Sequence, residues 1–206
     1  MKLYYSPIAC SLAVHIALNE SGLPYTLEKV IDLRSTERKT ENGEDFLSVN
    51  PAGYVPALKL ENGRVITEGG AILEYIADLA PNAKLAPAHT SFERTEMRSW
   101  LYFLATEILK GAGPLFNPTS TPEARQAATT RLQTRFAIME KRLSDGRSFL
   151  LGEDFSVADC YAYVVVGYAY MLKLDMSAYP KLTAYINRIG ERPTVKEAKK
   201  EEGQST

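Results

Sequence analysis

The sequence predicts an α/β domain over roughly its first eighty residues and an all-α domain, a helical bundle, over the remainder. Three observations support this division. Strand-like and helix-like segments alternate in the first part, Asn62-Gly63 lies between two short apolar runs, and helix-start sequences recur after Pro87. We place the first domain at residues 1–80, a linker at residues 81–89 and the helical domain at residues 90–206.

The first domain opens with a βαβ order. Residues 2–5 predict a short strand, and residues 25–30 predict a second one. Between them, residues 10–21 carry apolar side chains at helical spacing, and Gly22 ends the helix. The polar segment 34–44 is compatible with a loop or with a frayed helix.

A ββα order follows. Residues 57–60 and 65–67 flank Asn62-Gly63, which favours a tight hairpin turn. The next helix repeats apolar residues from Ile72 to Leu79 at helical spacing, and Pro81 stops it. The order βαβ and then ββα is that of a thioredoxin-like domain.

The second domain is marked by helix-start sequences. They combine capping residues with acidic residues or proline in the first turn. They lie at Thr90-Ser91-Phe92-Glu93, Thr121-Pro122-Glu123, Ser156-Val157-Ala158-Asp159 and Tyr179-Pro180. The first opens a long helix toward Gly111, and the last opens a helix that ends before Arg192-Pro193. Residues 199–206 are expected to form a solvated, mobile tail.

Composition excludes several functions. A formal net charge of -1 argues against a nucleic-acid surface. Two cysteines and two histidines without ligand-like spacing argue against a metal site. No run approaches the ~20 apolar residues of a membrane span, and Pro7 interrupts any signal-like start. We therefore expect a cytoplasmic protein with reduced thiols, no metal, and neither membrane nor nucleic acid as a partner.

Two neighbouring segments predict a site for a small zwitterionic peptide. Val55-Pro56 precedes a strand, and backbone groups beside such a proline can pair with an extended peptide. The helix that begins after Thr67 presents free amide groups, which can hold a carboxylate. Glu68 at that helix start supplies a negative charge for an amine.

Cys10 is the candidate reactive group, because it lies at the start of the first helix, directly after the loop that follows the first strand. Backbone amides there favour a thiolate, although most lone cysteines are small core residues. Cys10-Ser11-Leu12-Ala13 lacks a second thiol, which argues against a dithiol oxidoreductase. One thiol can still form a mixed disulfide or hydrogen-bond a bound thiol.

Hydroxyl groups nearby offer an alternative way to stabilise a bound thiolate. Strand alternation places Tyr4 and Tyr5 on opposite faces, so at most one of them reaches a ligand. We favour Tyr5 or Ser11 over Tyr4.

Farther along, tyrosines cluster between residues 161 and 170. They predict either core packing or, for Tyr168, a wall of an apolar substrate pocket between the domains.

The chain resembles the glutathione transferases, in particular the bacterial beta class, along nearly its whole length. The stretches that carry the resemblance are Met1-Lys2-Leu3-Tyr4-Tyr5-Ser6-Pro7, Ala9-Cys10-Ser11-Leu12, Asn50-Pro51, Val55-Pro56-Ala57-Leu58, Thr67-Glu68-Gly69 and Ser156-Val157-Ala158-Asp159. The family implies a thioredoxin-like domain, an all-helical domain, glutathione as co-substrate, a role in detoxification, and a homodimer with shared active sites.

Carried over residue by residue, the resemblance makes Cys10 the thiol beside the glutathione sulfur. Val55 would pair with the peptide backbone, with Pro56 in the cis form. Glu68 and Gly69 would hold the γ-glutamyl end. The glycine carboxylate is left open between Arg38 and Lys39, and Lys39 is carried forward as a glutathione-binding candidate.

The long helix of the second domain both matches and departs from the family pattern. Glu107 and Lys110 match it and are carried over as glutathione-binding residues. Beta-class relatives usually have a histidine where Leu109 stands and an asparagine where Tyr102 stands, so Leu109 removes a polar partner of the thiol. We assign Leu109 to the substrate pocket, together with Phe116 and Tyr168.

The expected function is conjugation of glutathione to electrophilic, apolar small molecules. The alternatives are thiol transfer through a Cys10-glutathione mixed disulfide, and a non-catalytic glutathione- or ligand-binding protein of the same fold. We also expect a homodimer, because Trp100 and the other apolar residues of its helix provide more apolar surface than one small domain can bury.

Overall fold

A computed structural model describes residues 1–33 and 35–204, and the chain divides into two compact units. The first unit comprises Met1–Ala86 together with the C-terminal segment from Arg192, and the second comprises Pro87–Glu191. This differs from the sequence-based division, which assigned everything after residue 90 to the helical domain. The difference arises because the last helix packs against the first helix of the chain.

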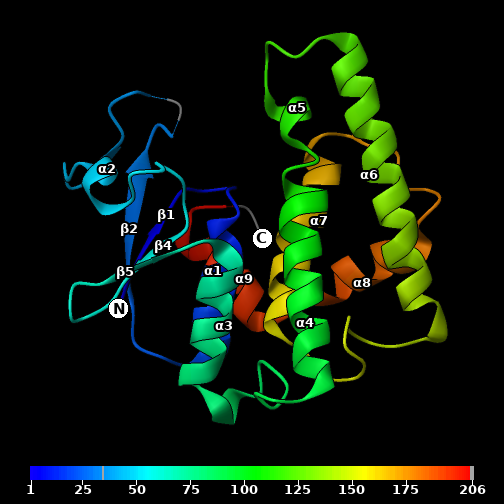
Figure 1. Cartoon of the computed structure of the whole chain (residues 1–206), viewed down its shortest axis with the longest axis horizontal. Coiled ribbons are helices and arrows are strands. Elements are labelled where there is room, and N and C mark those ends of the chain that lie inside the picture. Colours follow the sequence, from blue (N-terminus) through cyan, green and yellow to red (C-terminus); the bar gives the residue numbers. More distant parts are fainter. Residues whose placement is uncertain (34, 205–206) are drawn as a thin grey trace. The chain divides into compact units, whose positions relative to one another are not determined.

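The first unit is built on one mixed sheet in the order β3-β2-β1-β4-β5 (Figure 1). The strands are β1 (Lys2–Tyr5), β2 (Thr26–Ile31), β3 (Lys39–Thr40), β4 (Ala57–Lys59) and β5 (Val65–Thr67). Strand β1 pairs parallel with β2 and antiparallel with β4. Helix α1 (Ser11–Ser21) connects β1 to β2, and α3 (Gly69–Leu79) follows β5, which confirms the predicted βαβ and ββα orders.

Local turn signals behaved as predicted in this unit. Gly22 ends α1 in the left-handed conformation, with φ 67°. Gly63 has φ 82° in the β4–β5 hairpin, where the Leu60 N–H donates to the Arg64 carbonyl. The undecided polar segment contains the short strand β3 and is followed by α2 (Phe46–Val49), which the sequence did not predict. Arg34 lies outside the described residues.

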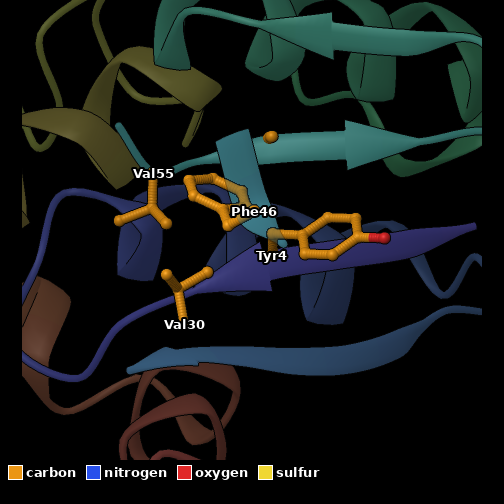
Figure 2. Packing of buried hydrophobic residues seen from close by; sticks show 5 residues of the cluster. Tyr4, Val30, Phe46 and Val55 are labelled. Carbon is orange, nitrogen blue, oxygen red and sulfur yellow. The ribbon is translucent and has the colours of Figure 1, made fainter. Parts of the chain in front are cut away.

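The two faces of the sheet bury different sets of side chains. On one face Tyr4 packs with Val30, Phe46, Val55 and Ala57 (Figure 2). The other face carries α1 and α3, and α9 (Pro193–Glu201) packs against α1 (Figure 1). Phe46 comes from α2, so this short helix covers the Tyr4 face.

The predicted solvated tail was wrong in part, because residues 199–201 continue helix α9 and Glu202 is buried, whereas Lys200, Glu201 and Gly203 are exposed. His15 of α1 is fully buried, with Nδ1 3.0 Å from Glu202 Oε1 and Nε2 2.7 Å from Glu201 Oε2. Arg192 Nε donates to Glu20 Oε1 over 2.6 Å. These partners lie more than 170 residues apart, so no local pattern signals them. Residues 205 and 206 lie outside the described part.

The second unit is helical, as predicted. Every residue from 87 to 191 is described, and these residues form no strand, only an isolated bridge between Phe149 and Gly152. The elements are α4 (Phe92–Phe103), a π-helix η2 (Leu104–Leu109), α5 (Gly113–Phe116), α6 (Pro122–Arg142), a short 3₁₀ turn η3 (Leu143–Asp145), α7 (Val157–Met171) and α8 (Pro180–Gly190). In the described part of the chain, no helix combines the length and apolar character needed to cross a membrane.

Two details of the first long helix differ from prediction. Its N-cap is Ser91 rather than Thr90, because the Ser91 hydroxyl accepts the Arg94 N–H at 3.1 Å. The α-helix ends at Phe103 and continues as the π-helix, in which the Lys110 N–H donates to the Ala105 carbonyl. The predicted starts at Pro122 and Pro180 are confirmed.

Asp159 joins three segments of the second unit. Its fully buried carboxylate accepts hydrogen bonds from the Ser156 N–H (2.8 Å) and the Ser156 hydroxyl (2.8 Å). It also accepts the Leu150 N–H (2.9 Å) and the Tyr185 hydroxyl (2.6 Å). Burial raises the pKa of Asp159, and these donors oppose the rise. The carboxylate therefore ties the start of α7 to α8 and to the preceding loop.

We predict that Tyr185→Phe lowers the free energy of unfolding by about 1.5–3 kcal/mol, because it removes a donor from a buried carboxylate. Tyr170→Phe is the matched control. Its exposed hydroxyl donates to the Thr183 hydroxyl at 3.1 Å, and its loss should change the free energy of unfolding by less than about 0.5 kcal/mol. Urea denaturation measures both, and equal effects of the two substitutions would contradict the role given to Asp159.

Candidate functional site

Strand pairing brings three predicted site segments to one end of the sheet. Ala57, the first residue of β4, is paired with Tyr4 of β1 on one side and Thr67 of β5 on the other. The chain leaving β1 leads to Cys10, the chain entering β4 carries Val55-Pro56, and the chain leaving β5 carries Glu68. Because β1 and β5 both run antiparallel to β4, these segments are adjacent.

Cys10 and Val55 meet directly. Cys10 is the half-buried N-cap residue of α1, and its thiol donates to the Val55 carbonyl over 3.4 Å. The amide groups of the first turn of α1 follow immediately, so their partial positive charge lies close to the sulfur. The structure therefore places the predicted reactive thiol against the predicted peptide-binding segment.

Val55 is followed by a cis peptide bond to Pro56, as the resemblance implied. Among residues 1–33 and 35–204, no group accepts a hydrogen bond from the Val55 backbone N–H. The carbonyl of the same residue engages only the Cys10 thiol there and has room for a second donor. Val55 thus presents one donor and one acceptor, as an unpaired strand residue does.

The start of α3 is open to an anionic group. Glu68 is its N-cap residue, with φ 67°, and its exposed side chain does not cap the helix. Gly69, at the first helical position, is buried. The amide groups of this first turn are therefore left for another acceptor, and the Glu68 carboxylate lies beside them.

The side chains of Arg38 and Lys39 have different neighbours. The Arg38 Nε donates to the Leu33 carbonyl at 2.9 Å, and the guanidinium lies 5.8 Å from the centre of the Tyr54 ring. A side chain at Gly53 would collide with Arg38. Lys39 is mostly exposed, and its ammonium lies 3.8 Å from Glu37. Arg38, rather than Lys39, lies against the segment that leads into Val55.

The three candidate hydroxyl groups have different neighbours. Ser11 is fully buried, and its Oγ both donates to the Ser6 carbonyl and accepts the Ser6 N–H, each at 3.2 Å. Tyr5 is buried with its ring 6.4 Å from that of His15, and burial together with the Glu202 charge raises its pKa. Tyr4 extends away from Val55 and donates to Glu44 at 2.8 Å (Figure 2).

The remaining predicted residues belong to the second unit. Glu107, Leu109 and Lys110 lie on or directly after the π-helix, and the Glu107 carboxylate pairs with Arg135 Nη2 over 2.6 Å. Phe116 and Tyr168 meet edge to face, with ring centres 5.2 Å apart. The structure thus brings Phe116 and Tyr168 together.

Two exposed apolar residues next to the site were missed from the sequence. Ile8 is 56% exposed and has φ 67°, and Tyr54 is 63% exposed directly before Val55. The only available signal was their proximity to Cys10 and to Val55-Pro56, because apolar residues in loops are common. Within the described residues, no three His, Cys, Asp or Glu side chains gather as a metal site would require.

Comparison with known proteins identifies related families. Residues 9–79 match the family model for the N-terminal domain of glutathione S-transferases, and residues 103–193 match the model for the C-terminal domain. A curated relative, glutathione S-transferase GstA of Escherichia coli O157:H7, is 40% identical over 203 residues, covering 98% of this chain and 99% of the relative.

Two solved structures are also similar to this chain. A sphingomonad glutathione S-transferase complexed with glutathione superimposes with a TM-score of 0.93 at 48% identity, and all of both chains is covered. The bacterial beta-class glutathione S-transferase of Sphingomonas chungbukensis gives a TM-score of 0.93 at 47% identity, again over both whole chains.

The exposure of the two cysteines predicts selective alkylation. Cys10 is half-buried at a helix start, whereas Cys160 is fully buried in α7. Iodoacetamide near neutral pH should modify Cys10 at least about tenfold faster than Cys160, because Cys10 is partly accessible and Cys160 is fully buried. Mass spectrometry of peptides measures both rates, with urea-unfolded protein as the control in which they converge. Equal rates in the native protein would contradict this environment for Cys10.

Proposed function

The chain belongs to the glutathione S-transferase family, and on this basis we propose that it conjugates the thiol of glutathione to electrophilic, apolar small molecules. The observation that carries the proposal is the meeting of the Cys10, Val55-Pro56 and Glu68 segments at one end of the sheet. They offer a thiol, a strand-like backbone and a helix start with a carboxylate, which match the sulfur, the peptide groups and the zwitterionic end of glutathione.

Binding uses complementary groups along the tripeptide. The Val55 N–H and carbonyl pair with the cysteinyl residue of glutathione as in strand addition. The amides of Gly69 and the rest of the first turn of α3 hold the γ-glutamyl carboxylate, and Glu68 holds its ammonium group. For the glycine carboxylate, Lys39 is the candidate carried forward from the sequence. Arg38 is the better-placed alternative because it lies against Ala52 and Tyr54.

Catalysis then requires a thiolate at the glutathione sulfur. The Cys10 thiol has one proton to donate, so with glutathione bound it exchanges the Val55 carbonyl for that sulfur and stabilises its anionic form. The thiolate attacks the electrophilic carbon, and a carbon–sulfur bond forms. With an aryl halide the halide leaves with the bonding electron pair. The thiol proton has passed to water beforehand.

Cys10 is preferred over the two hydroxyl candidates as the activating group. Ser11 is fully buried and uses its hydroxyl to hold the Ser6 backbone, so it supports the loop that carries Cys10. Tyr5 is buried beside His15. Cys10 is the one of the three that contacts Val55.

The second unit supplies the proposed apolar pocket. Phe116 and Tyr168 form an edge-to-face pair suited to an aromatic ligand, and Leu109 adds an aliphatic surface where beta-class relatives usually have histidine. Lys110 and Glu107 stay predictions as glutathione contacts. The ion pair with Arg135 occupies part of the hydrogen-bonding capacity of Glu107.

We further propose that the protein acts in detoxification in the cytoplasm as a homodimer. Within residues 1–33 and 35–204, neither Cys10 nor Cys160 forms a disulfide, which suits a reducing compartment. Phe92 at the start of α4 is 77% exposed and Tyr102 near its end is 71% exposed. Exposed aromatic side chains at both ends of α4 support a dimer in which this helix is buried against a second copy of the chain.

Changing Cys10 tests its role. Cys10→Ala should lower the rate of conjugation to an aryl halide about tenfold to a hundredfold, because one hydrogen bond to a charged sulfur is lost. Glutathione brings its own sulfur, so activity should not vanish. Transfer from a glutathione mixed disulfide should be abolished in the same variant if it occurs at all.

Ser11→Ala and Tyr5→Phe are the comparison variants, assayed with melting temperature as a control for folding. Loss of conjugation in either of them, with Cys10→Ala fully active, would overturn the assignment of Cys10. Retention of the wild type on immobilised glutathione without turnover of either substrate would favour a binding protein over an enzyme.

Dimer formation is tested by sedimentation at micromolar concentration. We expect a two-chain species, with an interface that buries more than ~1,200 Å² in total. Phe92→Glu should shift the population toward monomer, because it places a charge in an apolar contact, whereas Ile138→Glu on α6 serves as a control at an apolar residue that is half-exposed. A wild-type protein that sediments only as monomer would contradict the proposal.

A further inference from the structure

A cavity of about 190 Å³ lies between helix α8 and the turn that follows α6. Its lining residues all lie between positions 143 and 188, so it belongs to the second unit, every residue of which is described. It shares no residue with the candidate site at Cys10 or with the proposed apolar pocket at Leu109, Phe116 and Tyr168. Three basic side chains line it, and within this described unit no aspartate or glutamate does.

One face of α8 forms one side of the cavity. The residues on this face have the spacing of side chains that lie together along a helix, and they are Lys181, Ala184, Tyr185 and Arg188. Because Ala184 is short, it leaves space between the two long basic side chains. Tyr185 is buried, and so is Leu143, which comes from the turn after α6. The cavity therefore joins a positively charged part to an apolar part.

The charge of Arg147 is compensated within the fold. Its Nε donates to Asp145 Oδ1 at 2.9 Å, and its Nη1 donates to the Leu150 carbonyl at 3.1 Å. These contacts hold the guanidinium in place and occupy donors on both of its edges. Arg147 is therefore a fixed wall of the cavity rather than the group that is left for a ligand.

Arg188 and Lys181 keep donors for a ligand. Arg188 Nη1 donates to the Ser148 carbonyl at 2.6 Å, which holds the guanidinium in place. Within residues 1–33 and 35–204, the other N–H groups of Arg188 form no hydrogen bond or ion pair, and the Lys181 ammonium has no carboxylate partner. The amides at the start of α8 are occupied, because the Glu140 carboxylate accepts the N–H groups of Lys181 and Leu182.

We propose that this cavity binds a small aromatic carboxylate. The remaining N–H groups of Arg188 donate to the carboxylate in the two-pronged geometry that arginine offers to such groups. Lys181 adds positive charge on the same helix face, and the ring of the ligand lies against Leu143 and Tyr185. At about 190 Å³ the cavity is smaller than the ~300–1,000 Å³ of sites for drug-sized ligands, so it favours a single ring over a tripeptide such as glutathione.

Titration of the full chain with benzoate, followed by backbone amide chemical shifts in NMR spectra, tests the proposal. We expect saturating shifts at residues 143–147 and 181–188, with a Kd on the order of 1 mM, which is ordinary for so small a ligand. Benzyl alcohol has the ring without the charge, and inorganic phosphate has charge without the ring. Each should bind at least about tenfold more weakly than benzoate.

Two variants locate the contacts, with melting temperature as a check on folding. Arg188→Gln should weaken benzoate binding about tenfold to a hundredfold, because hydrogen bonds to a charged group are lost. Ala184→Met should abolish binding, because it fills the cavity while both basic side chains remain. Lys141→Gln is the matched control, since it removes one positive charge from an exposed side chain that does not line the cavity, and it should change Kd less than about twofold.

Several results would overturn the site. Equal weakening by Lys141→Gln and Arg188→Gln would reduce the effect to net charge. Phosphate binding as tightly as benzoate would contradict the aromatic class of ligand. Shifts confined to the segments around Cys10 and Val55, or no shifts up to about 20 mM benzoate, would remove the cavity as a binding site. Each of these results leaves the proposed conjugation of glutathione intact, because that activity is measured with other substrates.

Discussion

The site depends on the register in which strand β4 pairs with β1 and β5. Its first residue, Ala57, is paired with both Tyr4 and Thr67, and the register of both pairings is set by the face of the sheet on which Tyr4 and Ala57 are buried. A slip of one residue in either pairing would turn these side chains to the opposite face. Because the register is held in this way, the chain before β4 must run beside the chain after β1 and the chain after β5. The contact of Cys10 with Val55 follows from that geometry.

In each unit, a cluster of buried polar side chains holds helices together through hydrogen bonds. In the first unit, His15 of α1 lies between Glu201 and Glu202, so the helix that begins beside Cys10 is anchored to the end of the chain. Burial raises the pKa of Glu202, and the hydrogen bond from His15 opposes the rise. In the second unit, Asp159 serves as a common acceptor. Each cluster offsets the cost of burying charge with several short hydrogen bonds.

Sequence reasoning succeeded where the determinant is local. The left-handed Gly22, the turn at Gly63 and the capping of α7 by Asp159 depend on neighbours within a few residues. The docking of Glu202 on His15 was missed because it depends on a partner far away in sequence. The same limit explains why α9 and the short strand β3, which exist through tertiary pairing, went unpredicted.

The features of the site also fall into those that the sequence predicted and those that it did not. The resemblance assigned Cys10 and Val55 separately to glutathione, and the fold brings the two residues into contact because both lie next to strands with strong pairing signals. The choice between Arg38 and Lys39 was open in the sequence, since alternation cannot say which face of a short edge strand meets the ligand. The left-handed conformation of Ile8 was also invisible, because no residue type at that turn position predicted it.

We propose that the junction of Cys10 with Val55 receives the sulfur and the peptide backbone of glutathione. A crystal structure of the protein with glutathione bound tests this most directly. We expect the glutathione sulfur within about 4 Å of Cys10 Sγ, a hydrogen bond from the Val55 N–H to the peptide at about 2.9 Å, and the amino group of glutathione at Glu68. A peptide bound away from Val55, or a sulfur directed away from Cys10, would contradict it.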